Sequence, residues 1–577
     1  MPPSYDLLDC VVIKINRLQK YLFNGLLLSA VAILMRTVSV SFNVFVSARV
    51  GAEGMGLLNL TQTVYGFAIT LATSGINLAV VRLVSNALPY GNESYFDKKS
   101  DRRVYKIMRN ALFYCLFFSI LSSLLLFFGA NTLGTYALGD KRTIPSLKLL
   151  SLTLVPISLS SALNGYFSAV RRVYKSVIVQ VCEQGAKITV VSALLMLIAP
   201  RGLEYACVAV VAGGAVSEAV CVIISATLYF FDRKIHKSPK FKKVLNTDKR
   251  EKNGDTVSHF DVSGVKKGSF VKAATKPQAS IEDKKKSSII SIALPVAIST
   301  YVRSALLTIE HLAIPWGLKK SGASAKSALS SYGVLHGMVF PVLLFPSAVL
   351  SAFSSLLIPE LSSALEKKDK RRIEHIVSRV FYLSLLFAIG VAGIFVCFSY
   401  ELGAFIYDNR ESGEFIRMLA PLIPLMYLDH AVDAMLKGLG EQLYTMRVNI
   451  IDALLSVVLV LTLLPAMGIH GYVVVIFLME LFNTALSVIK LLSITKIKTP
   501  IGKWVFKPLL CVISSTVITR LVFNSQLFYS FLISYVTPRT GCILEICFCA
   551  LLYILLSRIS GVISKKEVKA VKHLIKT

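Results

Sequence analysis

Residues 22–46, LFNGLLLSAVAILMRTVSVSFNVFV, decide the class of fold. This stretch is long enough to cross a bilayer, because a membrane span needs about 20 predominantly apolar residues. Arg36 nevertheless lies deep inside it. A charge in the middle of a span costs roughly 2.5–3.5 kcal/mol on insertion-based scales, so a purely structural helix would be expected to lack one. The stretch therefore predicts a membrane helix that borders a hydrated interior.

The rest of the chain repeats this pattern. It has 577 residues, a hydrophobic content of 54% and a mean hydropathy of +0.65, far from the composition of a soluble globular protein. Counting the apolar stretches predicts an all-α integral membrane protein with about fourteen transmembrane helices. The first stretch follows no recognisable cleavage site, so we expect it to remain as a span.

The distribution of positive charge predicts the topology. The net charge is +30, and about 48 of the 63 Lys and Arg residues fall on one set of alternating loops. The positive-inside rule assigns that set to the cytoplasm, so both termini are predicted to be cytoplasmic in a multi-pass protein of the plasma membrane. This placement explains the charge without a nucleic-acid partner. Two cytoplasmic termini require an even number of spans, which agrees with fourteen.

The two halves of the chain resemble each other weakly. Arg36 and Arg303 lie at corresponding depths in the first and seventh spans, and Glu183 and Glu218 correspond to Asp452 and Glu480. Six spans per half give parallel repeats, and transporters bind at such a repeat interface. We predict four regions: an N-terminal lobe, a basic flexible linker, a C-terminal lobe, and two further spans with a basic tail. Their boundaries are 1–231, 232–287, 288–493 and 494–577.

Polar side chains form stripes on two of the predicted spans. Arg36 and Asn43 lie seven residues apart on the first span, as do Arg303 and Glu310 on the seventh, so each pair shares a helix face. We expect both stripes to face a central cavity. Two arginines suit an anion, because guanidinium binds phosphate oxygens in a bidentate manner. The alternative is that buried neighbours neutralise these charges and hold helices together.

Carboxylates in the spans are candidates for coupling. Glu183, Glu218 and Glu310 could bind a proton or a sodium ion and link its gradient to movement. Glu183 and Lys187 are spaced i, i+4 in the order that favours an intrahelical ion pair, so they could instead satisfy each other. We therefore assign Glu183, Lys187, Glu218, Glu310 and Asn43 to the cavity or to coupling.

Motifs for catalysis and for metal binding are absent from the sequence as we read it. There is no Walker P-loop, no HExxH and no Gly-x-Ser-x-Gly, and the ten cysteines lack metal-ligand spacing. The sequence thus predicts a protein that is not an enzyme, with no cofactor apart from a coupling ion. Because the duplication supplies both halves of a pathway, we expect a monomer.

Three segments resemble a known family. Residues 46–87, VSARVGAEGMGLLNLTQTVYGFAITLATSGINLAVVRLVSNA, resemble the first helix hairpin of the stage V sporulation protein B and polysaccharide-exporter families. Residues 163–188, LNGYFSAVRRVYKSVIVQVCEQGAKI, resemble the segment joining their fourth and fifth spans. Residues 332–365, YGVLHGMVFPVLLFPSAVLSAFSSLLIPELSSAL, are similar to the eighth span. These families belong to the multidrug/oligosaccharidyl-lipid/polysaccharide (MOP) flippase superfamily, which includes lipid II flippases.

The resemblance implies two six-helix lobes with two C-terminal helices, working by alternating access. It implies a lipid-linked saccharide as substrate, an undecaprenyl-pyrophosphate oligosaccharide or a peptidoglycan precursor, moved from the inner to the outer leaflet in contact with membrane lipid. Arg36 and Arg303 match the cavity arginines that bind pyrophosphate in related flippases. Glu310 stands where relatives often carry aspartate. A role in sporulation is also an implication of the resemblance.

Two other functions remain open at this point. A cation-coupled multidrug exporter would require a cavity dominated by carboxylates. A non-transporting membrane scaffold would depend on the basic linker, which could recruit anionic lipid or acidic partners.

Overall fold

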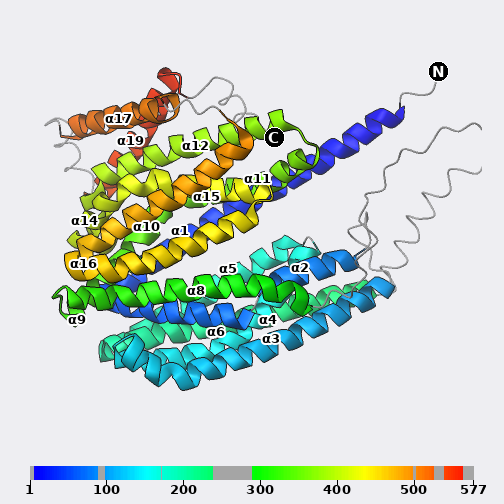
Figure 1. Ribbon diagram of the computed structural model, residues 1–577, viewed down its shortest axis with the longest axis horizontal. Helices are drawn as coiled ribbons and strands as arrows, with labels where there is room; N and C mark the ends of the chain where they lie inside the picture. Colours follow the sequence, from blue (N-terminus) through cyan, green and yellow to red (C-terminus); the bar gives the residue numbers. More distant parts are fainter. Residues whose placement is uncertain are drawn as a thin grey trace, which may run out of the picture.

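The computed structural model describes residues 5–73, 75–88, 98–170, 172–237, 289–497, 502–524 and 538–562. Every element in these ranges is helical (Figure 1), in agreement with the predicted all-α class. The predicted linker 232–287 lies outside the described residues from position 238 onward, as does the tail from position 563.

The described residues of the first half form six α-helices and three short turns. These are α1 (Tyr5–Thr73), α2 (Ile76–Ala87), α3 (Lys98–Thr132), η1 (Leu133–Ala137), η2 (Lys141–Thr143), α4 (Ile144–Ala169), α5 (Val173–Ile198), η3 (Ala199–Arg201) and α6 (Leu203–Lys237).

The second half begins after the linker and continues to the last described helix. It comprises α8 (Ile289–Lys320), α9 (Ala325–Gly333), η4 (Val334–Val339), α10 (Phe340–Leu344), α11 (Ser347–Glu366), α12 (Lys370–Cys397), α13 (Ser399–Tyr407), α14 (Arg410–Leu419), η5 (Ala420–Leu422), α15 (Ile423–Gly438), α16 (Gln442–Thr495), η6 (Gly502–Phe506), α17 (Lys507–Phe523) and α19 (Pro538–Ile559).

Eleven segments of the described residues are long and apolar enough to cross a membrane, which makes this a multi-pass membrane protein. Two of them, Val31–Ala87 and Gln442–Thr495, contain 57 and 54 residues. At 1.5 Å per residue, each is far longer than a bilayer core of about 30 Å requires. The count of fourteen crossings therefore stays a prediction, while the helical membrane class is confirmed.

Glycines explain how these two long segments change direction. Gly51 in α1 has φ 70° and ψ −178°, and Gly468 in α16 has φ 60° and ψ −141°. Glycine adopts such angles readily because it lacks a Cβ. In α16 the two arms then lie side by side: the Tyr444 hydroxyl donates to the Leu486 carbonyl over 3.2 Å, and Lys490 pairs with Glu441 at 3.3 Å.

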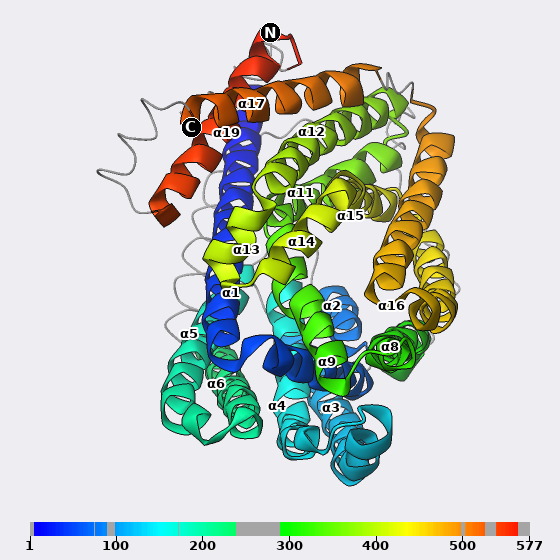
Figure 2. The same cartoon turned by 90° about the vertical axis from the view of Figure 1, so that its left-hand side faces the viewer.

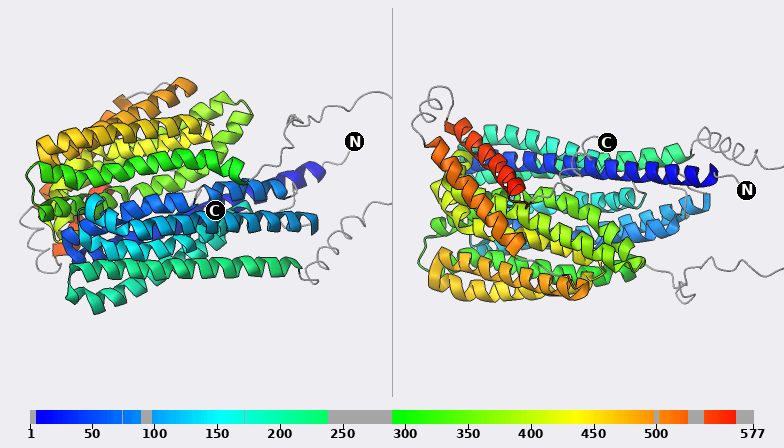
Figure 3. Two further views of the ribbon diagram at one scale, coloured as in Figure 1. Left: turned by 60° about the horizontal axis from the view of Figure 1, so that its bottom comes forward. Right: turned by 90° about the horizontal axis from the view of Figure 1, so that it is seen from above.

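The helices form two lobes with an appendage. Helices α1 to α6 make the first lobe and α8 to α16 the second, with long helices running side by side along the long axis (Figure 3). Helices α17 and α19 pack on each other and on α12 at the outer side of the second lobe (Figure 2). Tyr553 of α19 fixes this contact by donating a hydrogen bond of 2.7 Å to the Leu386 carbonyl.

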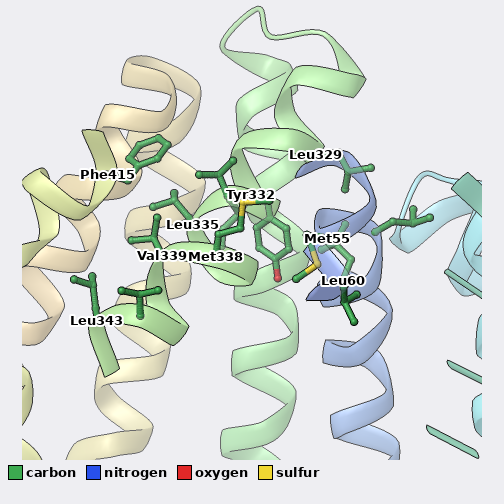
Figure 4. Packing of buried hydrophobic residues seen from close by; sticks show 14 of the residues in the cluster. Met55, Leu60, Leu329, Tyr332, Leu335, Met338, Val339, Leu343 and Phe415 are labelled. Atoms are coloured by element: carbon green, nitrogen blue, oxygen red, sulfur yellow. The ribbon is translucent and has the colours of Figure 1, made fainter. Parts of the chain in front are cut away.

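The lobes are pressed together near α9, at the end of the molecule that we call the α9 end. A Cβ atom on Gly333 would lie 2.1 Å from the Ala52 carbonyl oxygen, and one on Gly56 would lie 2.1 Å from the Leu329 oxygen. No side chain fits at such a distance. Around this contact, Tyr332 lies between Met338 of its own lobe and Met55 of α1 (Figure 4). We call this contact of α1 with α9 and η4 the glycine seam.

Charged groups of the first lobe border the glycine seam. The Arg142 side chain pairs with Glu53 at 2.9 Å and with Asp140 at 2.6 Å. Although burial alone would raise the pKa of Asp140, the hydrogen bonds from Arg142 outweigh it and hold the pKa below its usual value. On the second-lobe side of the seam, the Ser331 hydroxyl of α9 donates to Glu411 of α14 over 2.9 Å.

At the opposite end of the first lobe, α6 extends past the predicted lobe boundary at residue 231. Asp232 is 1% exposed and pairs with Arg172, at 2.6 Å, and with Lys175. The sequence placed Asp232 at the start of a flexible linker because a polar run begins there. The structure instead places it in the lobe, because two cations following α4 neutralise its carboxylate.

Candidate functional site

A cavity of about 580 Å³ lies between the lobes. Helices α1, α4, α5 and α6 of the first lobe form most of its wall, and the second lobe contributes η4 and α10. Five of the seven residues that the sequence singled out line this cavity: Arg36, Asn43, Glu183, Lys187 and Glu218. Their gathering from three helices agrees with the expected hydrated interior, although the function of each residue stays a prediction.

Helix α1 contributes one cation, Arg36, to the cavity wall. Its side chain is exposed and forms no ion pair with another described residue. It lies close enough to α15 of the second lobe to act electrostatically on Tyr427 and His430. A guanidinium without a carboxylate partner, placed between two lobes, has all five of its donors available to an anion.

Across the cavity lie the charged side chains of α5 and α6. Glu183 and Lys187 form no ion pair with each other within the described residues, so the intrahelical pair that the spacing allowed is not made. Both instead act electrostatically on Glu218. The cavity therefore holds two cations and two carboxylates without tight pairing.

Asn43 links the cavity wall to the glycine seam. Its side-chain amide donates a hydrogen bond of 2.7 Å to the Gly337 carbonyl in η4. The polar stripe predicted on the first span thus has two parts. Arg36 faces the open cavity, whereas Asn43 is engaged in holding the lobes together.

Arg303 and Glu310 do not line this cavity, so the expected pair of arginines in a single cavity is not formed. Glu310 instead points towards α16, where it accepts a hydrogen bond of 2.6 Å from Ser456. Arg303 is exposed and lies close enough to Asp452, also on α16, to act on it electrostatically. Arg303 and Glu310 lie outside the cavity because α8 turns the helix face that carries them towards α16 of its own lobe.

The second lobe carries an acidic cluster that corresponds to the cavity carboxylates. Asp452 and Glu480 are the predicted counterparts of Glu183 and Glu218. Asp452 acts electrostatically on Glu480 and on Asp429 of α15, and Asp429 also acts on Glu480. Asn483 donates to Asp429 over 3.3 Å. Corresponding positions are thus acidic in both lobes, but only those of the first lobe, Glu183 and Glu218, line the cavity. No cluster of three or more metal-ligating side chains occurs among the described residues.

Sequence reasoning missed His336 as a cavity residue. It lies in the π-helical turn η4, lines the cavity, and is within hydrogen-bonding distance of the Tyr472 hydroxyl, at 2.9 Å. A π-helical turn inside a helix often marks a functional site. No helical spacing relates His336 to the charged residues of the first lobe, so only the packing of the lobes brings them together.

A second, apolar chamber of about 400 Å³ shares one lining residue with the cavity. Val40 of α1 lines both spaces. The chamber walls come from α1, α10, α12, α13 and α19, with Pro346 between α10 and α11. They include the side chains of Val342, Phe345, Val391, Phe395, Leu402 and Ile546. An apolar space therefore lies against the same helix whose Arg36 enters the polar cavity.

Two family models match the chain in succession. The Polysaccharide biosynthesis protein model matches residues 22–249, and the MatE model matches residues 321–462. Stage V sporulation protein B of Bacillus subtilis (strain 168) is 26% identical over 456 residues, covering 78% of this chain and 80% of that protein. The uncharacterized membrane protein YabM of the same organism is 20% identical over 423 residues, covering 73% of this chain and 70% of that protein.

Solved structures show the same fold. Lipid II flippase MurJ in an inward closed conformation gives a TM-score of 0.61 at 12% identity, covering 93% of this chain and 99% of that chain. An inward-facing multidrug resistance MATE family transporter of the MOP superfamily gives 0.57 at 13% identity, covering 81% of this chain and 99% of that chain. The arrangement of the lobes and both sequence matches lead to one conclusion: the chain belongs to the MOP flippase superfamily of membrane flippases and transporters.

Proposed function

We propose that the protein is a flippase that moves a lipid-linked saccharide, carried on undecaprenyl pyrophosphate or a similar polyprenyl anion, between the leaflets of the plasma membrane. The observation that carries the proposal is that Val40 lines two unlike spaces. One space contains charged side chains, among them an unpaired guanidinium, and the other is lined almost wholly by apolar side chains. A lipid-linked sugar has the same two parts, an anionic headgroup and a hydrocarbon tail.

In this proposal Arg36 binds the pyrophosphate. Hydrogen bonds between a guanidinium and phosphate oxygens are charge-assisted and bidentate, which makes them roughly twice as strong as neutral ones. Lys187 on the opposite wall adds a second cation to the same cavity. Glu183 and Glu218, together with the sugar-sized volume of about 580 Å³, offer acceptors for sugar hydroxyls.

Arg303 has a subordinate role, because it lies outside the cavity in this conformation. We propose that it meets the headgroup only when the lobes rearrange. The three acids Glu183, Glu218 and Glu310 influence the cycle by gaining or losing a coupling cation, either Na⁺ or H⁺. A single chain contains both lobes and the cavity, so we propose that the monomer is sufficient.

The positive-inside distribution orients the molecule. On this distribution we propose that the glycine seam lies outside and both termini inside. The seam then closes the external end while the cavity accepts substrate from the inner leaflet. Opening of the seam would release the substrate to the outer leaflet, which is alternating access between two packings of the same lobes.

Translocation in liposomes tests the proposal. The purified protein is reconstituted with a fluorescent undecaprenyl-pyrophosphate sugar, and a membrane-impermeant quencher reports the fraction on the outer leaflet over time. We expect the native chain to accelerate translocation. Arg36→Ala is expected to slow it at least tenfold, since hydrogen bonds to charged groups contribute about 1.5–3 kcal/mol.

The matched control is Arg49→Ala. Arg49 lies on the same helix, but its guanidinium sits 5.8 Å from the Phe45 ring and does not line the cavity. This variant should translocate at the native rate. If the native protein moves no polyprenyl-pyrophosphate sugar, whatever the headgroup, while eluting as a folded species, the proposal is wrong.

A cation-coupled multidrug exporter is the second candidate, and the acidic cluster of Asp429, Asp452 and Glu480 favours it. Such a protein would bind organic cations near these carboxylates. It predicts that an organic cation such as ethidium stabilises the protein against heat and that the triple amide variant loses this effect. Our proposal predicts stabilisation by undecaprenyl pyrophosphate instead.

A further inference from the structure

Two histidines of the second lobe lie face to edge beside the glycine seam. The ring centroids of His311 on α8 and His336 on η4 are 4.6 Å apart, with an angle of 65° between the planes. Each ring has one tyrosine partner. His311 Nδ1 lies 2.9 Å from the Tyr332 hydroxyl, and His336 Nε2 lies 2.9 Å from the Tyr472 hydroxyl. Tyr332 is 0% exposed and Tyr472 is 3% exposed.

The surroundings allow this pair to gain a single proton. A tyrosine hydroxyl can donate to a neutral imidazole or accept from a protonated one, so both tyrosines fit either state. A second positive charge 4.6 Å away would be strongly repelled. The carboxylate that lies nearest in sequence is Glu310, beside His311 on α8. Glu310 acts electrostatically on Tyr332 and Tyr472, and it is already bound by Ser456.

The pair has a path to water on one side. His336 lines the interlobe cavity, whereas His311 lies behind it against Tyr332. A proton from cavity water can therefore reach the ring nitrogen of His336, leaving hydroxide or a deprotonated buffer molecule behind. The imidazolium of His336 then lies beside the neutral ring of His311.

His336 lies in η4, the part of the second lobe that forms the glycine seam with α1. His336 lies between Gly333 and Gly337 in sequence. Gly333 abuts the Ala52 oxygen, and a Cβ on Gly337 would lie 2.8 Å from the Asn59 amide nitrogen. His336 meets cavity water on one side, and water can reach its other side, which faces the seam, only when the seam loosens. This placement connects the charge of the pair to the contact between the lobes.

We propose that the His311–His336 pair is a proton-binding site that controls the glycine seam. This inference deepens the proposed flippase by naming H⁺ as the coupling ion. A partly buried imidazolium is stabilised by water, and opening the seam admits water, so the open form binds the proton more tightly. By linkage, protonation favours opening of the α9 end. A proton taken up outside is then released when the seam closes, which couples inward proton movement to outward substrate movement.

Distance measurements between spin labels test the site without any lipid substrate. Labels are introduced through a noncanonical amino acid at Tyr136 of the first lobe and Arg410 of the second, so that the native cysteines do not interfere. Both side chains are highly exposed at the α9 end, at 84% for Tyr136 and 89% for Arg410. In the native chain, lowering the pH from 8 to 5 is expected to move the distance distribution towards longer values in one transition.

Two variants and a control decide the outcome. His336→Gln keeps an amide that can bond with Tyr472, and His311→Gln/His336→Gln removes both rings. Each variant should lose the pH-dependent shift in label distance. His470→Gln replaces an exposed histidine of α16 that is not part of the pair. This variant should keep the pH-dependent shift in label distance. A native chain that shows no shift, or variants that shift as the native chain does, would overturn the proposal. Because no polyprenyl lipid is present, a failed translocation assay would reject the proposed function and leave this result standing.

Discussion

The two lobes meet in one place and separate in another, and the two regions are built from different side chains. At the glycine seam, glycines bring backbones so close that a Cβ would lie 2.1 Å from a carbonyl oxygen. In the cavity, Arg36, Lys187 and two carboxylates remain without tight partners. The comparison teaches that closure depends on close packing, whereas recognition depends on charges left unsatisfied. The two properties can therefore be altered separately.

The largest effect is expected from adding a methyl group to the seam. In Gly333→Ala the new Cβ would collide with the Ala52 oxygen and the Gly56 nitrogen, both backbone atoms that cannot rotate away. Overpacking of this kind costs typically about 1–3 kcal/mol. The closed form should be destabilised by this amount, and the Tyr136–Arg410 label distance should lengthen at pH 8.

Gly66→Ala is the matched control, since a Cβ at Gly66 of α1 meets nothing within 4 Å. It should keep the native distance distribution. A seam that accepts Gly333→Ala without change would show that the lobes are not held by close packing there.

The next effect concerns the contact that joins cavity and seam. Asn43→Ala removes the hydrogen bond of 2.7 Å to the Gly337 carbonyl. A net loss of about 0.5–1.5 kcal/mol is expected for one such bond. We expect the closed form to weaken by this amount while headgroup binding in the cavity is kept, as measured by label distances and by lipid binding to the same preparation.

A charge change in the cavity should act on binding and leave closure alone. Glu218→Gln removes one of the two carboxylates that lie beside Lys187 and across the cavity from Arg36. For an anionic headgroup this should strengthen binding by about 1 kcal/mol, or several-fold in Kd. Glu204→Gln, on the same helix but outside the cavity, should bind as the native chain does. Weaker binding by Glu218→Gln would indicate that the site prefers a cation.

The smallest effect is expected at the ion pairs that border the seam. The pKa of Asp140 lies below its usual value of 3.8, so its contribution to stability is fully present above that value and is lost as the pH falls through the lowered pKa. Asp140→Asn should lower the free energy of unfolding by up to about 1 kcal/mol. The difference from the native chain should be the same at pH 7 and pH 5. If the difference in unfolding free energy between Asp140→Asn and the native chain were smaller at pH 5 than at pH 7, the pKa of Asp140 would be higher than we state.

Much of the fold could be predicted from sequence because the bilayer imposes length and apolarity on each helix. The position of Arg36 within residues 22–46 led us to expect a polar interior, and Arg36, Glu183 and Glu218 line one cavity in the structure. Periodicity identifies a helix face but not its neighbour, which is why Arg303 and Glu310 were expected in the cavity while α8 turns them towards α16. The place of His336 in the cavity could not be predicted from sequence, because its partners His311 and Tyr472 come from helices distant in the chain.

Binding of undecaprenyl pyrophosphate to the purified protein tests the central claim most directly. Its Kd is measured for the native chain, Arg36→Ala, Arg303→Ala and the control Arg49→Ala. We expect Arg36→Ala to raise the Kd at least tenfold, Arg303→Ala to raise it less, and Arg49→Ala to leave it unchanged, because only Arg36 enters the cavity. Native affinity in Arg36→Ala would contradict the assignment of the cavity as the headgroup site.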